Sequence, residues 1–441
     1  MWGIISSNNS LKQDWIKNKA ALGLTPLRRD ALAILEAGLD AIDTETIIRE
    51  EVRWDAAAGT LGVKEITINF AAYQRVYLVA FGKCAARAAA ALENIFGDAL
   101  TGGIVLDIQA GAFKKLISRV GTHPLPSAAN IQATEEIIKL LEGLTAEDLA
   151  LVVVSGGGSA LLFSPGQNDC ATIVQMTQAL TNAGATIAEL NTVRKHTSRA
   201  PGGQLAKIAY PATVLGLVFS DVVGNDLSVI ASGPLTKDQT TVAEARAILE
   251  KYNIFSPEKL SQFVITETPK NEKYFAQVKT VIIADNLRAL TAMKSAAEKL
   301  NYPATIETTT LTGLAPVIGA ALAAALRPAR SAFLYGGETT VEVISNAGQG
   351  GRNQELALAA LPQVKDKTVL MACASDGRDN SAAAGAIADV LSRQNAREKN
   401  LDPSEYLRTN NSYPFWQHCG GQIITGPTGA NVADLLLILT D

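Results

Sequence analysis

Residues 151–162 read LVVVSGGGSALL, and this stretch decides the fold class. The apolar run before Ser155 is typical of a buried strand, and SGGGSA is typical of a tight turn into a helix. One glycine is enough for most turns. Three in succession expose several backbone N–H groups at a helix start, where negative charge is favoured. The stretch therefore predicts a strand, a phosphate-binding loop and a helix. A simple tight turn is the alternative.

The same alternation of strand and helix recurs along the chain. Near-continuous apolar runs, such as Arg75–Phe81 and Val214–Phe219, alternate with helical patterns, such as Cys84–Phe96 and Leu287–Leu300. This order is typical of parallel sheets covered by helices on both faces, and it predicts an α/β fold. The other strands expected are Gly103–Ile108, Leu149–Val154, Thr280–Ala284, Ser331–Tyr335, Thr340–Ile344, Thr368–Ala372 and Gln422–Thr425.

A chain of 441 residues that is 47% hydrophobic and 19% charged is expected to form two domains. Its first 25 residues are poor in apolar side chains and predict a loosely held arm. A boundary is expected where polar stretches flank a helix between Pro234 and Pro269. We therefore predict an arm over residues 1–25, a larger nucleotide-binding domain over 26–245, and a second α/β domain over 246–441.

Composition excludes several classes of function. A net charge of −4 and an aromatic content of 5% argue against a nucleic-acid partner. The four cysteines form no CxxC pair, which fits the reducing cytoplasm. The N-terminus lacks the features of a signal peptide, and the apolar stretch over 313–326 is too short to cross a bilayer. We expect a cytoplasmic monomer or homodimer without a membrane partner.

Five expected strands end in glycine, small hydroxyl or charged residues. They end at Gly82-Lys83, Ser155–Ser159, Ser220-Asp221, Gly336–Glu338 and Ser375–Gly377. In open parallel sheets, ligands bind beyond the carboxyl ends of the strands. The pattern predicts a polar, anion-binding cleft between the two domains.

The glycine-rich loop fits no common phosphate-binding or esterase motif. Leu161 stands where both a dinucleotide fingerprint and an esterase elbow need a glycine, or an alanine in the fingerprint. The Gly82-Lys83 pair lacks the first glycine and the hydroxyl residue of a P-loop. We expect another type of nucleotide-phosphate loop, made of Ser155, Gly156, Gly157, Gly158 and Ser159.

Charged residues near these strand ends suit an anionic substrate. Lys83 follows a strand and opens a helix, where a cation is disfavoured unless an anion shares the site. Arg352 and Asn353 open a helical run after glycines, and arginine binds carboxylates or phosphates through a planar fork. Glu338 ends a strand between glycines and threonines. Solvated surface positions are the alternative for Lys83 and Arg352.

A second group lies further along the chain. Arg194 and Lys195 belong to a cluster of four basic or histidine residues within six positions, which suits an anionic substrate or a solvated helix face. Asp221 and Asp226 follow the next strand, and carboxylates beside phosphates suit Mg²⁺. Phosphoryl transfer depends mostly on positioning and electrostatics. The residues therefore predict a small-molecule phosphotransferase.

The longer motifs resemble the type II glycerate kinases, also called the MOFRL family. They are VVVSGGGSALL, NTVRKHTSRAPGGQLA, FSDVVGNDLSVIASGP, YGGETTVEV with GGRNQELALA, and ASDGRDNSAAAGA, and together they cover most of the chain. The resemblance implies two α/β domains, the larger Rossmann-like and mostly parallel, with the active site in the cleft. The implied reaction is Mg²⁺-dependent transfer from ATP to D-glycerate, giving 2-phosphoglycerate.

The resemblance also implies roles for single residues. Lys83 matches the lysine that neutralises the transferring phosphoryl group, and Arg352 matches the arginine near the substrate carboxylate. Glu338 and Asp376 match acidic positions that face glycerate, and either is a candidate base. The loop from Ser155 to Ser159 matches the nucleotide-phosphate loop.

The chain departs from the family pattern at places that touch the expected substrate side. Pro201 replaces a lysine, and SDGRDNSAAAGA is one residue shorter than its family counterpart and gains Arg378. A larger or more anionic sugar acid is therefore an alternative acceptor. An NAD(P)-dependent hydroxypyruvate reductase and a catalytically silent sensor are alternatives from other classes.

Overall fold

The computed structural model describes residues 13–441, which divide into two compact units. Unit 1 comprises residues 13–43, 286–428 and 433–441, and unit 2 comprises residues 44–285 and 429–432. Each unit is described by itself. The division differs from the predicted boundary at 245/246, because the strand over Val278–Ala284 pairs into the sheet of unit 2. Residues 26–43, by contrast, belong to unit 1.

Unit 2 is built on a parallel sheet of six strands. Their order is β6-β5-β4-β7-β8-β9, and every neighbouring pair is parallel. The chain runs outward from the centre to one edge, then returns to the centre and runs to the other edge. The direction reverses between β4 and β7, which is where ligands bind in doubly wound folds. The strands are β4 (Arg75–Phe81), β5 (Gly102–Asp107), β6 (Leu116–Val120), β7 (Asp148–Val154), β8 (Thr213–Phe219) and β9 (Val278–Ala284).

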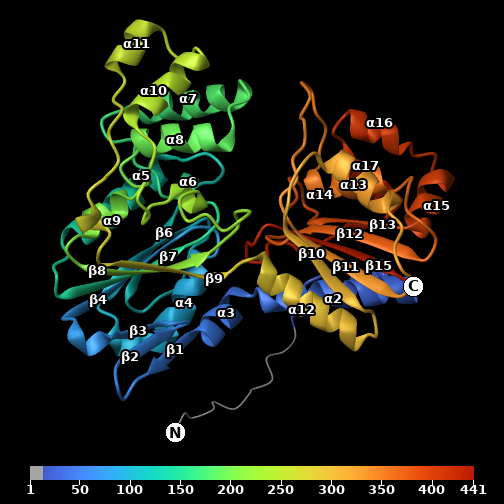
Figure 1. Cartoon of the computed structure of the whole chain (residues 1–441), viewed down its shortest axis with the longest axis horizontal. Coiled ribbons are helices and arrows are strands. Elements are labelled where there is room, and N and C mark those ends of the chain that lie inside the picture. Colours follow the sequence, from blue (N-terminus) through green and yellow to red (C-terminus); the bar gives the residue numbers. More distant parts are fainter. Residues whose placement is uncertain (1–12) are drawn as a thin grey trace. The chain divides into compact units, whose positions relative to one another are not determined.

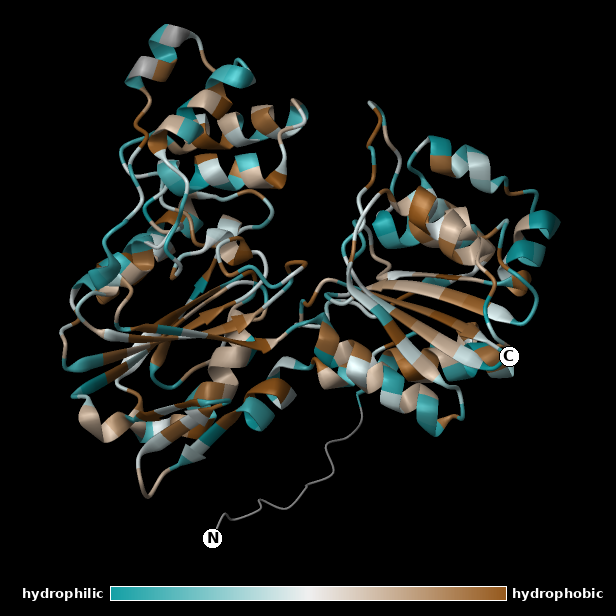
Figure 2. Cartoon of the chain, viewed as in Figure 1, coloured by the Kyte–Doolittle hydropathy of each residue, from teal (hydrophilic) through white to brown (hydrophobic). Residues whose placement is uncertain are grey.

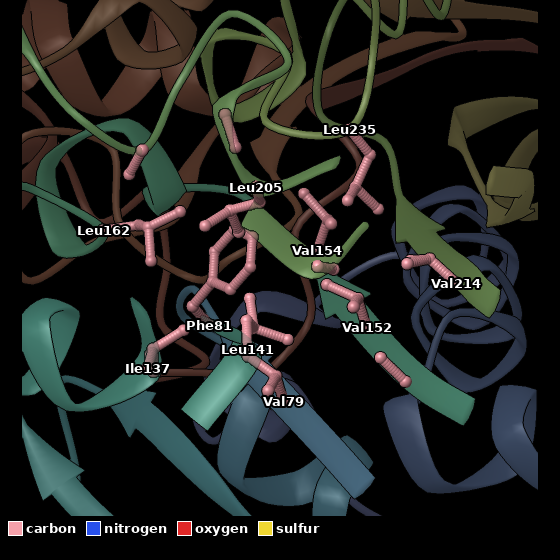
Figure 3. Close-up of a cluster of buried hydrophobic side chains, with 14 of the residues drawn as sticks. Val79, Phe81, Ile137, Leu141, Val152, Val154, Leu162, Leu205, Val214 and Leu235 are labelled. Carbon is pink, nitrogen blue, oxygen red and sulfur yellow. The ribbon is translucent and has the colours of Figure 1, made fainter. Parts of the chain in front are cut away.

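Helices cover both faces of this sheet, as Figure 1 shows. Helix α4 (Ala85–Phe96), with α3 (Thr44–Glu51) against it, lies on one face, and α5 (Ala128–Glu142) and α9 (Gln204–Ala209) lie on the other. Apolar side chains of β4, β7 and β8 meet those of α5 and α9 in a buried core (Figure 3). Because the strands are buried on both faces, their sequences are apolar without alternation.

Unit 2 carries two further layers. A small antiparallel sheet consists of β1 (Val52–Asp55), β2 (Thr60–Val63) and β3 (Ile66–Asn69). A group of helices beyond the glycine-rich loop has its own apolar core. These helices are α7 (Cys170–Asn182), α8 (Ile187–Thr197), α10 (Val242–Lys251) and α11 (Pro257–Gln262), and the short α6 (Gly158–Leu161) follows the loop directly.

Unit 1 contains a mixed sheet of six strands in the order β10-β11-β15-β12-β13-β14. Only β10 and β11 pair in parallel, and β15 runs antiparallel between β11 and β12. The second sheet is therefore mainly antiparallel. The strands are β10 (Ala304–Leu311), β11 (Ser331–Gly337), β12 (Thr368–Ala374), β13 (Gly385–Ala388), β14 (Gln422–Ile423) and β15 (Asp434–Thr440).

Helices also cover both faces of the second sheet. Helices α2 (Pro26–Ala41) and α12 (Asn286–Lys299) pack together on one face. Figure 2 shows that the strands of this sheet are mainly hydrophobic. The other face carries α13 (Ala315–Ala324), α14 (Arg352–Ala360), α15 (Val390–Glu398), α16 (Pro403–Arg408) and α17 (Ser412–Cys419).

Two further sequence predictions fail in this fold. The expected strand over Thr340–Ile344 forms only an isolated bridge between Thr340 and Leu314, because both sheet positions beside β11 are taken by β10 and β15. The expected arm lies partly outside the described residues, at 1–12, but the part from residue 13 is held firmly. Trp15 and Ile16 are buried, and the short helix α1 (Lys19–Leu22) precedes α2. No helix within residues 13–441 has the length and apolarity needed to span a membrane.

Candidate active site

The two central strands of unit 2 are fastened together where they end. The backbone N–H of Lys83 donates to the carbonyl of Gly156 at 2.9 Å, and the N–H of Ser155 donates to Phe81 at 3.1 Å. The N–H of Cys84 donates to the Ser155 hydroxyl at 3.4 Å. These contacts hold the turn after β4 against the glycine-rich loop after β7. The loop therefore lies at the reversal point of the sheet.

Close contacts explain two of the glycines. A Cβ at Gly156 would lie 2.2 Å from Asp221 Oδ2 and 2.3 Å from Asn431 Nδ2. Gly157 adopts φ +80°, and a Cβ there would lie 3.1 Å from both Lys83 Cγ and His123 Cδ2. The Lys83 side chain therefore lies over the loop backbone. The side chains of Lys83, His123 and Asp221 therefore all lie beside the loop in unit 2.

The two aspartates proposed for a metal lie in different surroundings. Asp221 Oδ2 accepts a hydrogen bond of 2.9 Å from Asn431 Nδ2, beside Gly156. Asp226 is exposed, and its carboxylate accepts from the backbone of Ser228 at 2.8 Å. Within residues 13–441 no three His, Cys, Asp or Glu side chains cluster as metal ligands. Asp221 alone faces the loop in a way that suits a cation held jointly with phosphate oxygens.

The helix after the loop is shorter than the sequence implied. Helix α6 spans only four residues, so its dipole adds little to anion binding. The N–H of Gly158 donates within the turn to the carbonyl of Ser155. Ser159 Oγ lies 2.9 Å from Ser232 Oγ, which in turn donates to Asn191. The loop therefore offers an anion the Lys83 side chain rather than a strong helix dipole.

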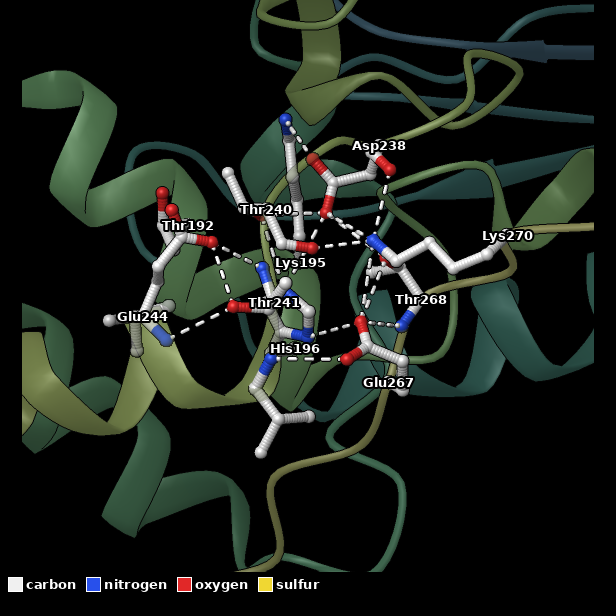
Figure 4. A network of polar contacts seen from close by, with 12 residues as sticks. Thr192, Lys195, His196, Asp238, Thr240, Thr241, Glu244, Glu267, Thr268 and Lys270 are labelled. Atoms are coloured by element: carbon white, nitrogen blue, oxygen red, sulfur yellow. Dashed lines mark hydrogen bonds and ion pairs between the residues drawn. The ribbon is translucent and has the colours of Figure 1, made fainter.

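The Lys195 ammonium is already paired and is not available to bind a substrate. Its ammonium donates to Asp238 at 3.0 Å, and both side chains are buried in the polar network shown in Figure 4. Burial would raise the pKa of Asp238, but hydrogen bonds from Thr240 and Lys195 outweigh it and lower the pKa. Lys195 is thus neutralised inside the helical layer.

Arg194, the neighbouring residue, lies in a different environment. It lines a pocket with Ser159, Pro201 and Ser232, and burial lowers the pKa of its guanidinium. No hydrogen bond or ion pair reaches its side chain from the described part of the chain, residues 13–441. The two neighbouring cations of the predicted cluster therefore differ: Lys195 forms a buried ion pair, and Arg194 has no partner among residues 13–441.

The second group of candidate residues lies in unit 1, around the N-terminus of α14. Arg352 binds Asp434 through two hydrogen bonds, from Nε to Oδ2 at 2.5 Å and from one terminal nitrogen to Oδ1 at 3.0 Å. The other terminal nitrogen lies 2.9 Å from Glu338 Oε1. Burial lowers the pKa of Arg352, but the two carboxylates outweigh it, and the net pKa is raised. Arg352 is therefore a fixed cation.

The Asp379 carboxylate binds backbone N–H groups at the N-terminus of α14. Its buried carboxylate accepts from the backbone N–H groups of Asn353 and Gln354, at 3.1 and 2.8 Å, and from both amide side chains. Burial, with Asp434 adding to it, raises the pKa of Asp379 to about 6. Asn353 is thus bound to Asp379, whereas Asp376 is half-buried and accepts at 2.9 Å from the N–H of Arg378.

Sequence reasoning did not identify Asp434, Asp379 or Asn431. Asp434 begins β15 and pairs in register with Gly337 and Ala374, the ends of β11 and β12. Because β15 is antiparallel to both strands, its first residue meets their last ones. The signal was present in DLLLILT, an aspartate at the start of an otherwise apolar strand, but the sheet was expected to be parallel.

Family models match most of the chain. Residues 30–265 match a model described as a domain of unknown function, DUF4147, and residues 331–434 match the MOFRL family. The fold and these matches define an α/β protein of two units with a glycine-rich loop at the reversal point of its parallel sheet. The chain belongs to the MOFRL family of type II glycerate kinases.

Relatives with printed functions extend over nearly the whole chain. It is 34% identical to a D-glycerate 2-kinase of Thermotoga maritima, covering 93% of this chain and 98% of that one. It is 35% identical to a glycerate 2-kinase of Pyrococcus horikoshii, covering 83% and 87%. A relative in Agrobacterium vitis, 35% identical with 88% and 92% covered, bears the name putative hydroxypyruvate reductase.

Solved structures agree with this membership. A glycerate kinase of Thermotoga maritima superposes with a TM-score of 0.81 at 34% identity, covering 94% of this chain and 99% of that one. A protein of Pyrococcus horikoshii superposes with a TM-score of 0.76 at 31% identity and the same coverage. The predicted α/β fold of two domains is confirmed.

Proposed function

We propose that this protein transfers the terminal phosphoryl group of ATP to D-glycerate, with Mg²⁺, to give 2-phosphoglycerate. One observation carries the proposal furthest: the Lys83 side chain lies over Gly157 at the reversal point of a parallel sheet. A lysine side chain at a glycine-rich loop suits phosphoryl oxygens. Membership of the glycerate kinase family supports the choice of reaction.

In this proposal Lys83 neutralises charge on the moving phosphoryl group, and the loop from Ser155 to Ser159 approaches the nucleotide phosphates through its backbone. The close contacts at Gly156 and Gly157 support this role, because side chains at either position would fill the space beside Lys83 and Asp221. Asp221 would hold Mg²⁺ together with phosphate oxygens, and the ion would offset their negative charge.

The residues of unit 1 fit the recognition of a small hydroxy acid. Arg352 is anchored by Asp434 on one side and meets Glu338 on the other. The Glu338 side chain is 44% exposed, so a substrate carboxylate can take its place on the arginine fork. Asp376 is held by its turn and remains the other candidate for accepting the proton of the substrate hydroxyl.

The reductase alternative finds no support in the turn after β4. In a doubly wound sheet of this order, the first strand and helix are β4 and α4, and their turn is where a dinucleotide fingerprint belongs. That turn reads FGKCAA, with a single glycine followed by Lys83. This turn suits a lysine that binds phosphate better than it suits the binding of a dinucleotide.

A kinase for a larger sugar acid is a second candidate, favoured by Arg378. This residue is exposed one position from Gly377, and its backbone N–H binds the carboxylate of Asp376. An added cation so close to a candidate base suits an acceptor with more oxygen atoms or negative charge.

An acceptor panel tests the proposal. Release of ADP is measured with D-glycerate and with four- and five-carbon aldonates, and NADPH oxidation is measured with hydroxypyruvate. The proposal requires the highest kcat/KM for D-glycerate and no NADPH oxidation. Preference for an aldonate that Arg378→Ser reverses would favour the second candidate, and NADPH oxidation without ADP release would contradict both kinase assignments.

A further inference from the structure

A pocket in unit 2 adjoins the glycine-rich loop but belongs to none of the roles assigned so far. It is lined by the loop after His123, by α6, and by the facing sides of α7 and α8. Its enclosed volume is about 60 Å³, and the space reaches about 550 Å³ when the open mouth is included, so a ligand would lie partly in the mouth. Pro124 and Ser159 line it, and each lies within two residues of the His123–Gly157 contact.

The walls of this pocket are largely apolar. Seven of the lining residues have hydrocarbon side chains: Pro124, Leu125, Pro126, Ala160, Phe163, Ile173 and Val174. Pro201 adds to them, at the position where the chain departs from the family lysine. A three-carbon hydroxy acid has little apolar surface to bury against such walls. A flat aromatic base has much more.

Arg194 supplies the polar counterpart. Arg194 lines the same pocket and is half-buried, and no hydrogen bond or ion pair reaches its side chain from anywhere in residues 13–441. Burial without a partner costs free energy, so such a group is expected to gain from a ligand. Arginine stacks on aromatic faces as well as binding anions. Ser159, Thr177, Thr197 and Ser198 add hydroxyl groups around it.

We infer that this pocket binds the purine base of the donor nucleotide, with Arg194 against the base and the apolar residues on its other side. The inference rests on the proposed function, since it takes the phosphates to lie at the loop beside Lys83. It assigns Arg194 to the nucleotide rather than to the hydroxy acid. Lys195, paired with Asp238, takes no part.

Two variants test the inference. Val174→Trp fills the pocket from a half-buried position on α7, and Arg194→Leu removes the cation. Arg53→Leu, an exposed arginine on β1, is the matched control. Isothermal titration calorimetry measures the affinity for ADP and for inorganic tripolyphosphate, and steady-state kinetics give KM for ATP and for D-glycerate. Thermal melting checks that each variant folds.

We expect both pocket variants to weaken ADP binding and raise KM for ATP at least tenfold, while tripolyphosphate affinity and KM for D-glycerate change less than threefold. Equal loss of tripolyphosphate binding, or a selective rise in KM for D-glycerate, would overturn the assignment to a base. Unchanged KM for ATP in a working kinase would overturn this inference alone. Selective loss of ADP binding in a protein that does not phosphorylate glycerate would uphold it and contradict only the proposed acceptor. A wild-type protein that binds no ADP would overturn both.

Discussion

At the scale of single residues, the candidate site contains side chains that the structure fixes in place. Arg352 is held by a bidentate bond to Asp434, which is itself buried at the start of β15. Two parallel N–H···O bonds set the plane of the guanidinium as well as its position. Asp434 therefore positions Arg352 without needing to contact the substrate.

The first prediction concerns Asp434→Asn. An asparagine keeps the volume but loses the charge and one acceptor, so Arg352 turns toward Glu338. We expect kcat/KM for D-glycerate to fall by about 10–100-fold, in line with the loss of a buried charged hydrogen bond. Asp366→Asn, whose carboxylate is 89% exposed in unit 1, is the control and should leave kcat/KM unchanged. Equal kcat/KM in both variants would show that Asp434 does not position Arg352 for the reaction.

The second prediction concerns Gly156→Ala. The added Cβ would lie 2.2 Å from Asp221 Oδ2 and 2.3 Å from Asn431 Nδ2, so both side chains must move. We expect KM for ATP–Mg²⁺ to rise about tenfold, with a ΔΔG of unfolding of about 1–3 kcal/mol from overpacking. Gly62→Ala, where the nearest atom would be 3.8 Å away, should change neither. A Gly156→Ala enzyme with normal kinetics would show that the loop does not serve the nucleotide.

At the scale of elements, strand β7 carries the glycine-rich loop at one end and a partly buried ion pair at the other. Arg75 Nε donates to Asp148 Oδ1 at 2.8 Å, and a terminal nitrogen of Arg75 donates to Oδ2 at 2.6 Å. These bonds join β4 to β7 at the ends of the two strands that lie opposite the loop. The side-chain hydrogen bond from Arg75 lowers the pKa of Asp148 to about 2.

The third prediction follows from this pKa. A carboxylate with a folded pKa of about 2 and an ordinary pKa of 3.8 stabilises the fold above pH 4, and the stabilisation disappears as pH falls toward 2. Asp148→Asn should be less stable than wild type by about 1–2 kcal/mol at pH 7, discounted for the half-exposed Arg75. Urea unfolding from pH 7 to pH 3 measures the difference. It should stay constant above pH 5 and shrink below pH 4; a difference independent of pH would contradict the ion pair.

Element by element, the sequence predicted the parallel sheet better than the mixed one. The strand Arg75–Phe81 is as predicted, and β7 and β8 differ from prediction by one residue, because apolar runs buried on both faces are easily recognised. Strand β10, with the partly exposed threonines of ATIETTTL, was not expected. Strand β15 is an unbroken apolar run between its two end residues. Its sequence therefore shows no alternation of polar and apolar residues that would mark it as a strand. Missing β15 is the reason that Asp434 was missed.

At the scale of the whole molecule, the chain enters each unit twice or more. Unit 2 takes in residues 429–432 between Thr428 and β15, and this short excursion brings Asn431 to Asp221. Local sequence patterns carry no information on such pairings across more than two hundred positions. For the same reason the predicted boundary at 245/246 differs from the division after residue 285. The residues at strand ends were predictable; their partners were not.

The candidate cations show the same limit. Arg194 and Lys195 are adjacent in the sequence and chemically alike, yet one lines a pocket and the other is buried against Asp238. Neighbours on a helix point about 100° apart, so only the surrounding fold separates their roles. Lys83 and Arg352, by contrast, were predicted from strand and helix boundaries that the structure contains. Their catalytic roles stay predictions.

The most direct test of the central claim is the product formed by the wild-type protein and by two variants. Protein, ATP, Mg²⁺ and D-glycerate are incubated together, and ³¹P NMR resolves 2-phosphoglycerate from 3-phosphoglycerate. We expect 2-phosphoglycerate from wild type and from the control Arg53→Leu, with a loss of rate of about 10²–10³-fold in Lys83→Ala and in Arg352→Ala, as is usual when a group that stabilises charge in the transition state is removed. Formation of 2-phosphoglycerate at an undiminished rate by Lys83→Ala, or no phosphoglycerate from the wild type, would contradict the central claim.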